Sequence, residues 1–445
     1  MEEPEQRTQR TFRLMILSSF IVPIVVSIGM YTAVYLYASR ELRHVKDNIR
    51  ASGYPVTLEE LDHYYDPGPG SAEAGYAIVA AFQKLNGKPV GKRDPLLLSG
   101  PYPEPGDAFD DEAIAATRAF VEQNRNLIDE ITALIDSNNV IRFPVDFKTI
   151  PKHNPFYYEQ IRSCIKLLSM DALLAVIDGV NERAVIRICT AYTLAESLRT
   201  EPLLLSQLVR GACLKIICDS LELILNHSTF VDGQLLRIQQ TLDEIHLNGS
   251  IAYGLIGERC ALLPVVEDQP PGSIDSLSDF YFTIPTYRRL ESITFANSCA
   301  TWIAIGKLPA FERAAAMDRF QQDLDKRPEF SNQMTKILSP AVARSFRAET
   351  HYLTRLSATS TAIAVIRFKR DRDRLPQNLG ELVPNYIAAI ATDQYDGHSL
   401  RYTQRDKGFV VYGLGYDGDD DGGIPPSKDE SLLTAGDVVF RILGQ

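Results

Sequence analysis

An uncharged stretch near the N-terminus limits the folds that this chain can adopt. Residues 14–39 contain no acidic or basic side chain and are mostly apolar. As a helix they span about 39 Å, which is enough to cross a hydrocarbon core of about 30 Å. Tyr31, Tyr35 and Tyr37 gather at the C-terminal end, as in an interfacial aromatic belt. We predict a transmembrane helix; the alternative, a cleaved signal peptide, has a shorter apolar core of about 7–15 residues.

The flanks of this helix carry basic residues on both sides. Arg7, Arg10 and Arg13 precede the span, and Arg40, Arg43, Lys46 and Arg50 follow it. The positive-inside rule therefore barely distinguishes the two orientations. A short N-terminus and a long C-terminal part are most simply inserted with residues 1–13 in the cytoplasm. We therefore predict a single-pass membrane protein whose C-terminal part lies outside the cytoplasm. Gly29 and Ala33 have the small-xxx-small spacing that would support a homodimer.

Composition narrows the class of partner. Of the 445 residues, 45% are hydrophobic and 23% are charged, which is typical of a globular protein. The net charge of −11 argues against a nucleic-acid partner, because such proteins carry basic patches that neutralise phosphates. Cys164 and Cys213 lie on apolar helical stripes, and no Cys-x-x-Cys spacing occurs among the six cysteines. We expect buried free thiols and no zinc site.

Helical periodicity dominates the chain between the span and the C-terminal tail. Residues 40–108 predict juxtamembrane helices followed by a linker rich in proline and glycine. Residues 109–370 predict an irregular array of antiparallel helices. Its clearest apolar stripe consists of Leu205, Leu208, Val209, Ala212, Cys213, Ile216 and Ile217. We expect an irregular break from Leu263 to Pro285, because that stretch contains several prolines, beginning with Pro264.

The pattern changes in residues 371–445, which predict a small α+β module with antiparallel strands. The expected strands cover residues 399–404, 408–415 and 437–443. The first two are separated by a three-residue turn that suits a hairpin. The predicted fold class is therefore mainly α, with an N-terminal transmembrane helix, an irregular α-helical array and this terminal module.

An aspartate-rich loop lies between the last two predicted strands. Asp417, Asp419 and Asp421 alternate along it and Gly422 follows, as in the head of an EF-hand loop. Alternate carboxylates on such a loop can converge on one hard cation, and without a counter-ion they repel one another. Lys428 stands where an EF-hand has its bidentate glutamate, so an EF-hand itself is not expected. We predict a structural Ca²⁺ site; the alternative is a solvated acidic loop without an ion.

The tail also carries a series of short motifs: Leu375-Pro376, Leu382-Val383-Pro384, Thr392-Asp393, Gly397, Leu400-Arg401-Tyr402, Gly415-x-Asp417-Gly418 and Asp437-Val438. In this order they resemble the C-terminal part of the major pseudopilin of type II secretion systems, which implies a helix, strands and a calcium loop. By this resemblance Asp417 and Asp437 fall on acidic positions of the calcium loop, whereas Asp419 and Asp421 are assigned from spacing alone. Together with the helical middle and the N-terminal anchor, this tail also resembles a group of uncharacterised bacterial envelope proteins. That likeness covers most of the chain and implies location in the bacterial inner membrane.

The sequence contains no recognised catalytic motif. A P-loop, a Rossmann glycine pattern and a Gly-x-Ser-x-Gly elbow are all absent from it. A helical array without catalytic spacing favours a non-enzymatic interaction or scaffold protein that binds a protein partner in the envelope. Two alternatives stay open. One is a membrane-tethered hydrolase with a site near Glu258, and the other is a component of a secretion or pilus-like system.

Overall fold

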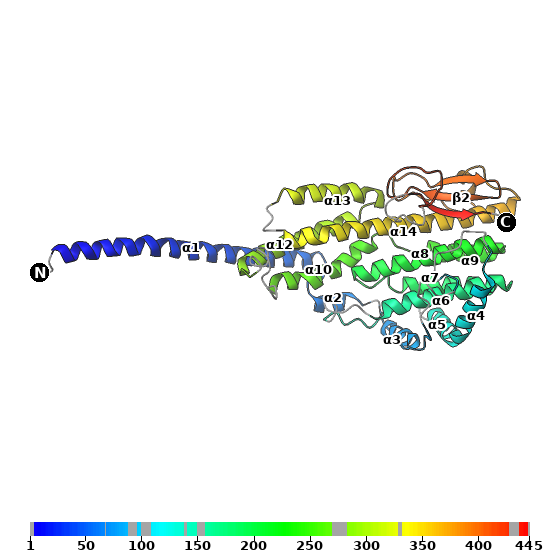
Figure 1. Cartoon of the computed structure of the whole chain (residues 1–445), viewed down its shortest axis with the longest axis horizontal. Helices are drawn as coiled ribbons and strands as arrows, with labels where there is room; N and C mark the ends of the chain where they lie inside the picture. Colours follow the sequence, from blue (N-terminus) through cyan, green and yellow to red (C-terminus); the bar gives the residue numbers. More distant parts are fainter. Residues whose placement is uncertain are drawn as a thin grey trace.

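The computed structural model describes most of the chain. Its backbone is described for residues 4–66, 68–87, 96–98, 108–137, 140–148, 156–268, 283–327, 332–426 and 436–443, and its side chains within these ranges for Ser19 and from Ile21 onward. One long helix projects from an elongated body of packed helices (Figure 1). A small sheet covers one side of the body, at the end remote from the N-terminus.

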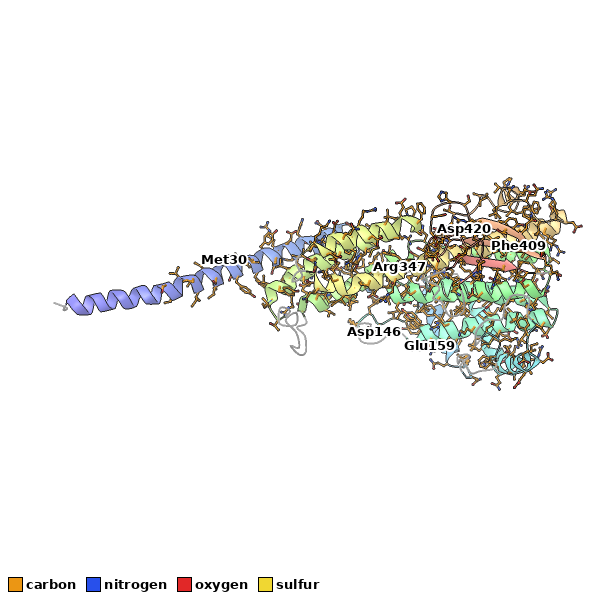
Figure 2. The ribbon with its side chains drawn as sticks, turned by 45° about the horizontal axis from the view of Figure 1, so that its top comes forward. Met30, Asp146, Glu159, Arg347, Phe409 and Asp420 are labelled. Carbon is orange, nitrogen blue, oxygen red and sulfur yellow. The ribbon has the colours of Figure 1, made fainter. Side chains whose placement is uncertain are left out.

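The projecting element is α1 (Pro4–Ala51), a single helix of 48 residues. Most apolar side chains of residues 21–37 are exposed to solvent. Met30 is 65% exposed, on the part of α1 that stands clear of the body (Figure 2). The segment Ile21–Ala51 is long and apolar enough to cross a membrane. The N-terminal apolar helix expected from the sequence is therefore present.

The same helix enters the body without a break. Ala38 and Leu42 are buried, and this part of α1 packs along α12 (Pro285–Gly306). One turn further on, Lys46 forms an ion pair with Glu267 at the end of α10. The expected juxtamembrane helix is thus the continuation of the apolar helix, and it is fixed to the body by packing and charge.

The remaining helices form the elongated body seen in Figure 1. Their bounds are α2 (Leu58–Tyr64), α3 (Ser71–Phe82), α4 (Asp111–Gln123), α5 (Arg125–Ser137), α6 (Tyr157–Ile177), α7 (Asn181–Glu196), α8 (Leu204–His227), α9 (Asp232–Asp243), α10 (Ser250–Asp268), α13 (Ala310–Asp325) and α14 (Gln333–Arg372). A short 3₁₀ turn, η2 (Leu379–Leu382), follows α14. Consecutive helices such as α6 and α7 pack directly on one another, as an antiparallel array requires.

Two apolar cores hold the body together. The larger one surrounds α6, α7 and α8, and it reaches past α14 to the inner face of the sheet. The smaller one joins the end of α1 with α2, α10, α12, α13 and the start of α14. Trp302, the only tryptophan, is buried in the smaller core, where its ring contacts Phe295 and Phe320 at steep angles. Because α14 contributes to both cores, this helix of 40 residues connects the anchor end of the body to the sheet.

The sheet has three antiparallel strands in the order β1-β2-β3. Their bounds are β1 (Arg401–Arg405), β2 (Gly408–Gly413) and β3 (Val438–Ile442). The central strand β2 is buried on both faces. Phe409 and Val411 face the larger core, next to α14. Val410 and Tyr412 alternate with them and form a small cluster with Val439 on the outer face, so the strand has the period of two expected of β-structure.

The mainly α fold class, with its N-terminal apolar helix and small C-terminal antiparallel sheet, is confirmed. The irregular break expected from Leu263 is wrong in its first part, because α10 continues through Pro264 to Asp268. Leu263 and Val266 are buried in the smaller core, and their packing outweighs the backbone hydrogen bond that Pro264 removes. The rest of that stretch, residues 269–282, lies outside the described residues.

The expectation that the cysteines are buried free thiols is confirmed. All six are free and buried. Burial raises the pKa of the Cys164 thiol and of the Cys213 thiol to about 12. These thiols therefore stay protonated at neutral pH, and protonated thiols are poor nucleophiles and poor metal ligands.

Candidate functional site

Two carboxylates join the two ends of the acidic loop by accepting hydrogen bonds from its backbone. Asp417 Oδ2 accepts from the Gly436 N–H at 3.0 Å. Asp437 Oδ2 accepts from the Gly423 N–H at 2.8 Å, and the Asp437 N–H donates to Ile424 O at 2.9 Å. The two residues placed by the pseudopilin resemblance therefore lie where the two ends of the loop meet, and they join the start of the loop to the start of β3.

Asp437 lies in surroundings that disfavour the negative charge of its carboxylate. Its side chain is 1% exposed, and its Oδ1 atom is buried without a hydrogen-bond partner among the described residues. The pKa of Asp437 is raised to about 6, mainly by burial and in addition by the nearby negative charges of Asp420 and Asp421. Asp437 therefore has a carboxylate oxygen with unused hydrogen-bonding capacity, in surroundings that favour the protonated form.

The other two predicted ligands are placed differently. Asp419 and Asp421 are exposed, and their carboxylates form no hydrogen bond or ion pair with another described residue. Within the described ranges, no three histidine, cysteine, aspartate or glutamate side chains are grouped as a metal site requires. Lys428 lies outside the described residues. The structure brings Asp417 and Asp437 together, and it does not converge the four predicted ligands on one point.

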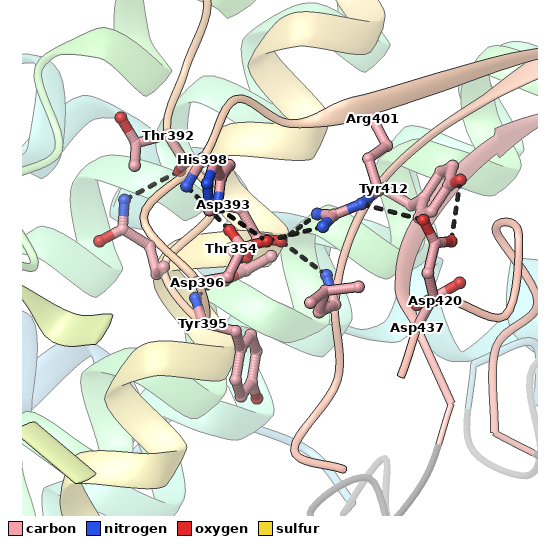
Figure 3. A network of polar contacts seen from close by, with 12 residues as sticks. Thr354, Thr392, Asp393, Tyr395, Asp396, His398, Arg401, Tyr412, Asp420 and Asp437 are labelled. Carbon is pink, nitrogen blue, oxygen red and sulfur yellow. Dashed lines mark hydrogen bonds and ion pairs between the residues drawn. The ribbon is translucent and has the colours of Figure 1, made fainter. Parts of the chain in front are cut away.

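A positive charge beside the loop comes from Arg401 on β1 (Figure 3). Its three guanidinium nitrogens contact three carboxylates: Nη1 lies 2.7 Å from Asp393 Oδ2, Nη2 lies 2.6 Å from Asp396 Oδ2, and Nε lies 3.1 Å from Asp420 Oδ2. Asp420 Oδ1 also accepts from the Tyr412 hydroxyl at 3.1 Å. Part of the negative charge that suggested a counter-ion is therefore neutralised inside the protein.

Sequence reasoning missed the role of this network. Asp393 is fully buried, and its Oδ2 atom also accepts from the Leu414 N–H at 2.7 Å. Burial raises the pKa of Asp393. Hydrogen bonds from the Tyr395 and Leu414 N–H groups and, to a smaller extent, the charge of Arg401 offset part of that rise. The only signal in the sequence was that Asp393 and Arg401 both fall in the motif series of the tail. Nothing in their spacing showed that they would meet Asp420.

A cleft of about 510 Å³ lies next to the network, between α13, α14 and the terminal module. Apolar side chains form much of its wall: Ala310, Phe311, Ala314, Met317, Ala343, Phe346 and Leu414. Arg313, at the base, is held by an ion pair with Glu349. Among the described lining residues there is no histidine and no cysteine, but the carboxylates of Asp318 and Asp396 are present. The wall therefore offers apolar contact and several polar groups. A mostly apolar wall with a few polar groups suits the binding of a ligand or a partner.

The rim of the cleft carries two exposed aromatic rings. Phe311 is 39% exposed and Tyr416 is 38% exposed. The Arg347 guanidinium lies 4.3 Å from the centre of the Tyr416 ring, which is a cation–π arrangement. The Tyr395 hydroxyl, also in the lining, is buried without a partner among the described residues. Aromatic rings, an arginine and an unused hydroxyl are the groups that anchor ligands and protein partners.

Glu258, the residue suggested for a hydrolase site, lies where α10 crosses the start of α8. Its carboxylate accepts a hydrogen bond from the Leu204 N–H, at the first residue of α8. Burial raises the pKa of Glu258. It does not line the cleft. In this position Glu258 satisfies an amide that has no partner within its own helix, which is a capping role.

Comparisons with protein-family models, with curated proteins and with solved structures found no match for this chain. The resemblance of residues 371–445 to a pseudopilin module therefore stays a prediction. A functional conclusion has to rest on the geometry of the chain itself, which offers an anchor helix, a mostly apolar cleft and a tightly closed acidic loop.

Proposed function

We propose that this chain is a membrane-anchored interaction protein whose body binds a protein partner. The main support for the proposal is the exposed apolar surface of α1. Its apolar residues 21–37 are exposed on a helix that stands clear of the body. Exposed apolar area of this size is costly in water, and a bilayer would cover it. A scaffold or adaptor held at a membrane needs such an anchor and a binding surface on the attached body.

The proposed location is the bacterial inner membrane, with a single span and the body outside the cytoplasm. The long body that follows the span supports this insertion. The envelope-protein resemblance supports the compartment. The small-xxx-small pair Gly29 and Ala33 lies within the proposed span, where a second copy of α1 can approach closely.

The cleft between α13, α14 and the module is the proposed binding surface. Its volume of about 510 Å³ is large enough for several side chains of a partner. Phe311 and Tyr416 on the rim provide rigid aromatic area, and Arg347 stacks on the second ring. Interfaces concentrate binding energy on tyrosine, tryptophan and arginine anchors of this kind. A partner with an apolar side chain flanked by a carboxylate fits this combination.

Site-specific photo-crosslinking tests this function. A photoreactive amino acid is placed at Tyr416 of the full-length chain in intact cells, and membranes are washed at high pH before analysis. We expect the chain to remain in the membrane fraction and to form a discrete adduct with one protein. The additional substitution Arg347→Glu is expected to abolish that adduct, because it removes the guanidinium at the rim and reverses its charge.

The matched control places the same photoreactive group at Tyr76, which is 63% exposed on α3. This tyrosine does not line the cleft, so the discrete adduct should be missing there. Identical adducts from both positions, or an adduct at Tyr416 that survives Arg347→Glu, would contradict binding in the cleft. Release of the chain by the alkaline wash would contradict the anchor.

We also propose that the acidic loop binds Ca²⁺, since Asp437 Oδ1 is buried without a partner among the described residues and a cation would satisfy it. The described carboxylates do not yet form a complete site, so binding requires Asp417, Asp419 or Asp421 to move toward Asp437. Metal ligands must be ionised. Because the pKa of Asp437 is about 6, the ion should bind well above pH 6 and poorly below it.

Thermal unfolding tests this site. Saturating Ca²⁺ is expected to raise the Tm of the full-length chain by about 2–5 °C at neutral pH relative to chelator. The gain should disappear as the pH falls through 6. Without Ca²⁺ the pH dependence of stability has the opposite sign. The folded-state pKa lies above the ordinary value of 3.8, so protonation of Asp437 stabilises the folded chain as the pH falls from about 6 toward 4.

Substitutions distinguish a rise in Tm caused by specific Ca²⁺ binding from one caused by general screening of charge by salt. Asp437→Asn is expected to remove the Ca²⁺-dependent rise in Tm, and Asp417→Ala to reduce it. Lys326 and Asp323 form an exposed ion pair on α13, so Asp323→Asn removes a carboxylate far from the loop and should leave the rise intact. If Asp437→Asn retains the full rise, the Ca²⁺ assignment is wrong.

A further inference from the structure

A second cavity lies where α1 enters the body. It has a volume of about 360 Å³ and opens between α1, α10 and α12. Val45 and Ile49 of α1 and Ala300 and Ile303 of α12 supply apolar wall. Among the described residues, the lining contains two basic side chains, Arg259 and Lys307, and no acidic one. An apolar cavity with only positive charge in its lining is suited to a molecule that is apolar and anionic.

Arg259, on α10, is 2% exposed. Its Nη2 atom donates to Pro55 O at 2.9 Å, and its Nε atom is buried without a hydrogen-bond partner in the described part of the chain. Among the described residues it forms no ion pair with a carboxylate. A guanidinium carries five N–H groups, so a single short contact to a carbonyl leaves most of its hydrogen-bonding capacity unused. This residue provides an observation that is independent of the shape of the cavity.

The other buried arginines of the described chain are all paired. Arg210 contacts Glu196 at 2.7 Å, Arg355 contacts Glu222 at 2.6 Å, and Arg187 contacts Asp171 at 2.8 Å. Arg313 forms an ion pair with Glu349. This pattern is expected, because a buried charge without a partner costs several kcal/mol. Arg259 departs from it and lines a cavity that is open to a ligand.

Lys307 lies at the rim of this cavity. Its Nζ atom donates to the Tyr54 hydroxyl at 2.7 Å and lies 5.1 Å from the centre of the Tyr54 ring. Both residues line the cavity. The ammonium is therefore held near the opening, where it adds to the positive potential that an anion would meet before it reached Arg259.

We propose that this cavity binds a small amphiphilic anion, whose carboxylate or phosphate pairs with Arg259 and whose short apolar chain lies between α1 and α12. The position of the cavity suits an amphiphile. Val45 is six residues beyond the end of the uncharged span, about 9 Å along the helix. The headgroup layer of a bilayer is about 5–8 Å deep on each side. The cavity thus lies just outside that layer, so the anion can come from a lipid or from solution.

Calorimetric titration with octanoate tests the proposal. The full-length chain is held in nanodiscs of zwitterionic lipid, and octanol serves as the uncharged probe with the same chain length. Octanoate is expected to bind and octanol to bind at least about tenfold more weakly, because only the anion satisfies Arg259. Arg259→Met should weaken octanoate binding by about tenfold to a hundredfold. Equal affinity for octanoate and octanol in the unsubstituted chain would overturn the proposal.

A matched variant controls for net charge. Arg289, on α12, pairs with Glu267 and does not line the cavity. Arg289→Met removes one positive charge nearby and should leave octanoate binding unchanged. If it weakens binding as much as Arg259→Met does, the effect comes from the general field of the protein and the proposed contact is wrong. Arg259→Lys keeps the charge and should retain part of the affinity.

A second experiment identifies whether the anion is a lipid or a soluble molecule. The same chain is transferred to nanodiscs that contain an anionic phospholipid, and its Tm is compared with that in zwitterionic discs. An Arg259-dependent rise in Tm, together with weaker octanoate binding, assigns the site to a lipid headgroup. Octanoate binding that is unaffected by the anionic lipid assigns it to a soluble anion. Absence of any effect of Arg259→Met in both experiments overturns the proposal.

Discussion

Replacing Glu349 with alanine is expected to lower the free energy of unfolding by about 3–5 kcal/mol. Glu349 is fully buried on α14 and forms an ion pair with the buried Arg313 of α13. Its other oxygen accepts from the Ser250 hydroxyl at 2.7 Å and from the Ile251 N–H at 3.2 Å, at the start of α10. One carboxylate therefore joins three helices, and its removal leaves a buried guanidinium without a counter-charge.

Urea denaturation of the full-length chain in detergent measures this effect, followed by the far-ultraviolet circular dichroism of the helices. The matched control is Asp323→Ala, which breaks the ion pair with Lys326 on α13. Both partners of that pair are well exposed, at 67% and 74%, so the expected cost is below about 1 kcal/mol. Similar losses for the two variants would show that burial of the Glu349 pair does not determine its contribution.

The second large effect is expected for Gly257→Ala on α10, which should cost about 3 kcal/mol or more. A Cβ atom at Gly257 would lie 1.8 Å from Pro202 O, and one at Gly254 would lie 2.6 Å from the Leu204 Cα. These contacts are with backbone, which cannot move aside as a flexible side chain can. The two glycines let α10 approach the segment before α8, so that Glu258 can reach the Leu204 N–H.

The control for this substitution is Gly233→Ala on α9. No atom lies within 4 Å of a Cβ built there, and the residue is helical. Alanine should then stabilise the protein slightly, by about 0.4–1 kcal/mol, because it reduces the freedom of the unfolded chain. A Tm that falls for Gly257→Ala and rises for Gly233→Ala separates close packing from helix propensity. An unchanged Tm for Gly257→Ala would show that α10 can shift away at little cost.

The parts of the fold that were predictable from sequence depend on local signals. The uncharged stretch of α1 and the alternating strands around Val411 are visible as patterns within a few residues. Pro264 shows the limit of such reasoning. A proline normally ends a helix, but here Leu263 and Val266 are buried by helices distant in sequence, and only the packed structure shows that this contact outweighs the lost hydrogen bond.

The candidate sites depend on contacts between distant segments, and these were only partly predictable. Asp417 and Asp437 could be placed together because the pseudopilin resemblance assigns both of them to one calcium loop. Asp420, adjacent to two predicted ligands, pairs instead with Arg401, and no spacing rule distinguishes it from Asp419. Arg259 had no signal at all, since its lack of a carboxylate partner becomes visible only when every neighbour is known.

The unbroken course of α1 has a mechanical consequence. A flexible linker would let the body turn freely above the bilayer, whereas Ala38 and Leu42 are already buried in the body at the end of the apolar stretch. A spanning helix tilts when the bilayer becomes thinner or thicker. With the proposed insertion, α1 and the body would tilt together as one rigid unit. The direction in which the cleft faces would then depend on membrane thickness, so a local change in the bilayer could reorient the binding surface.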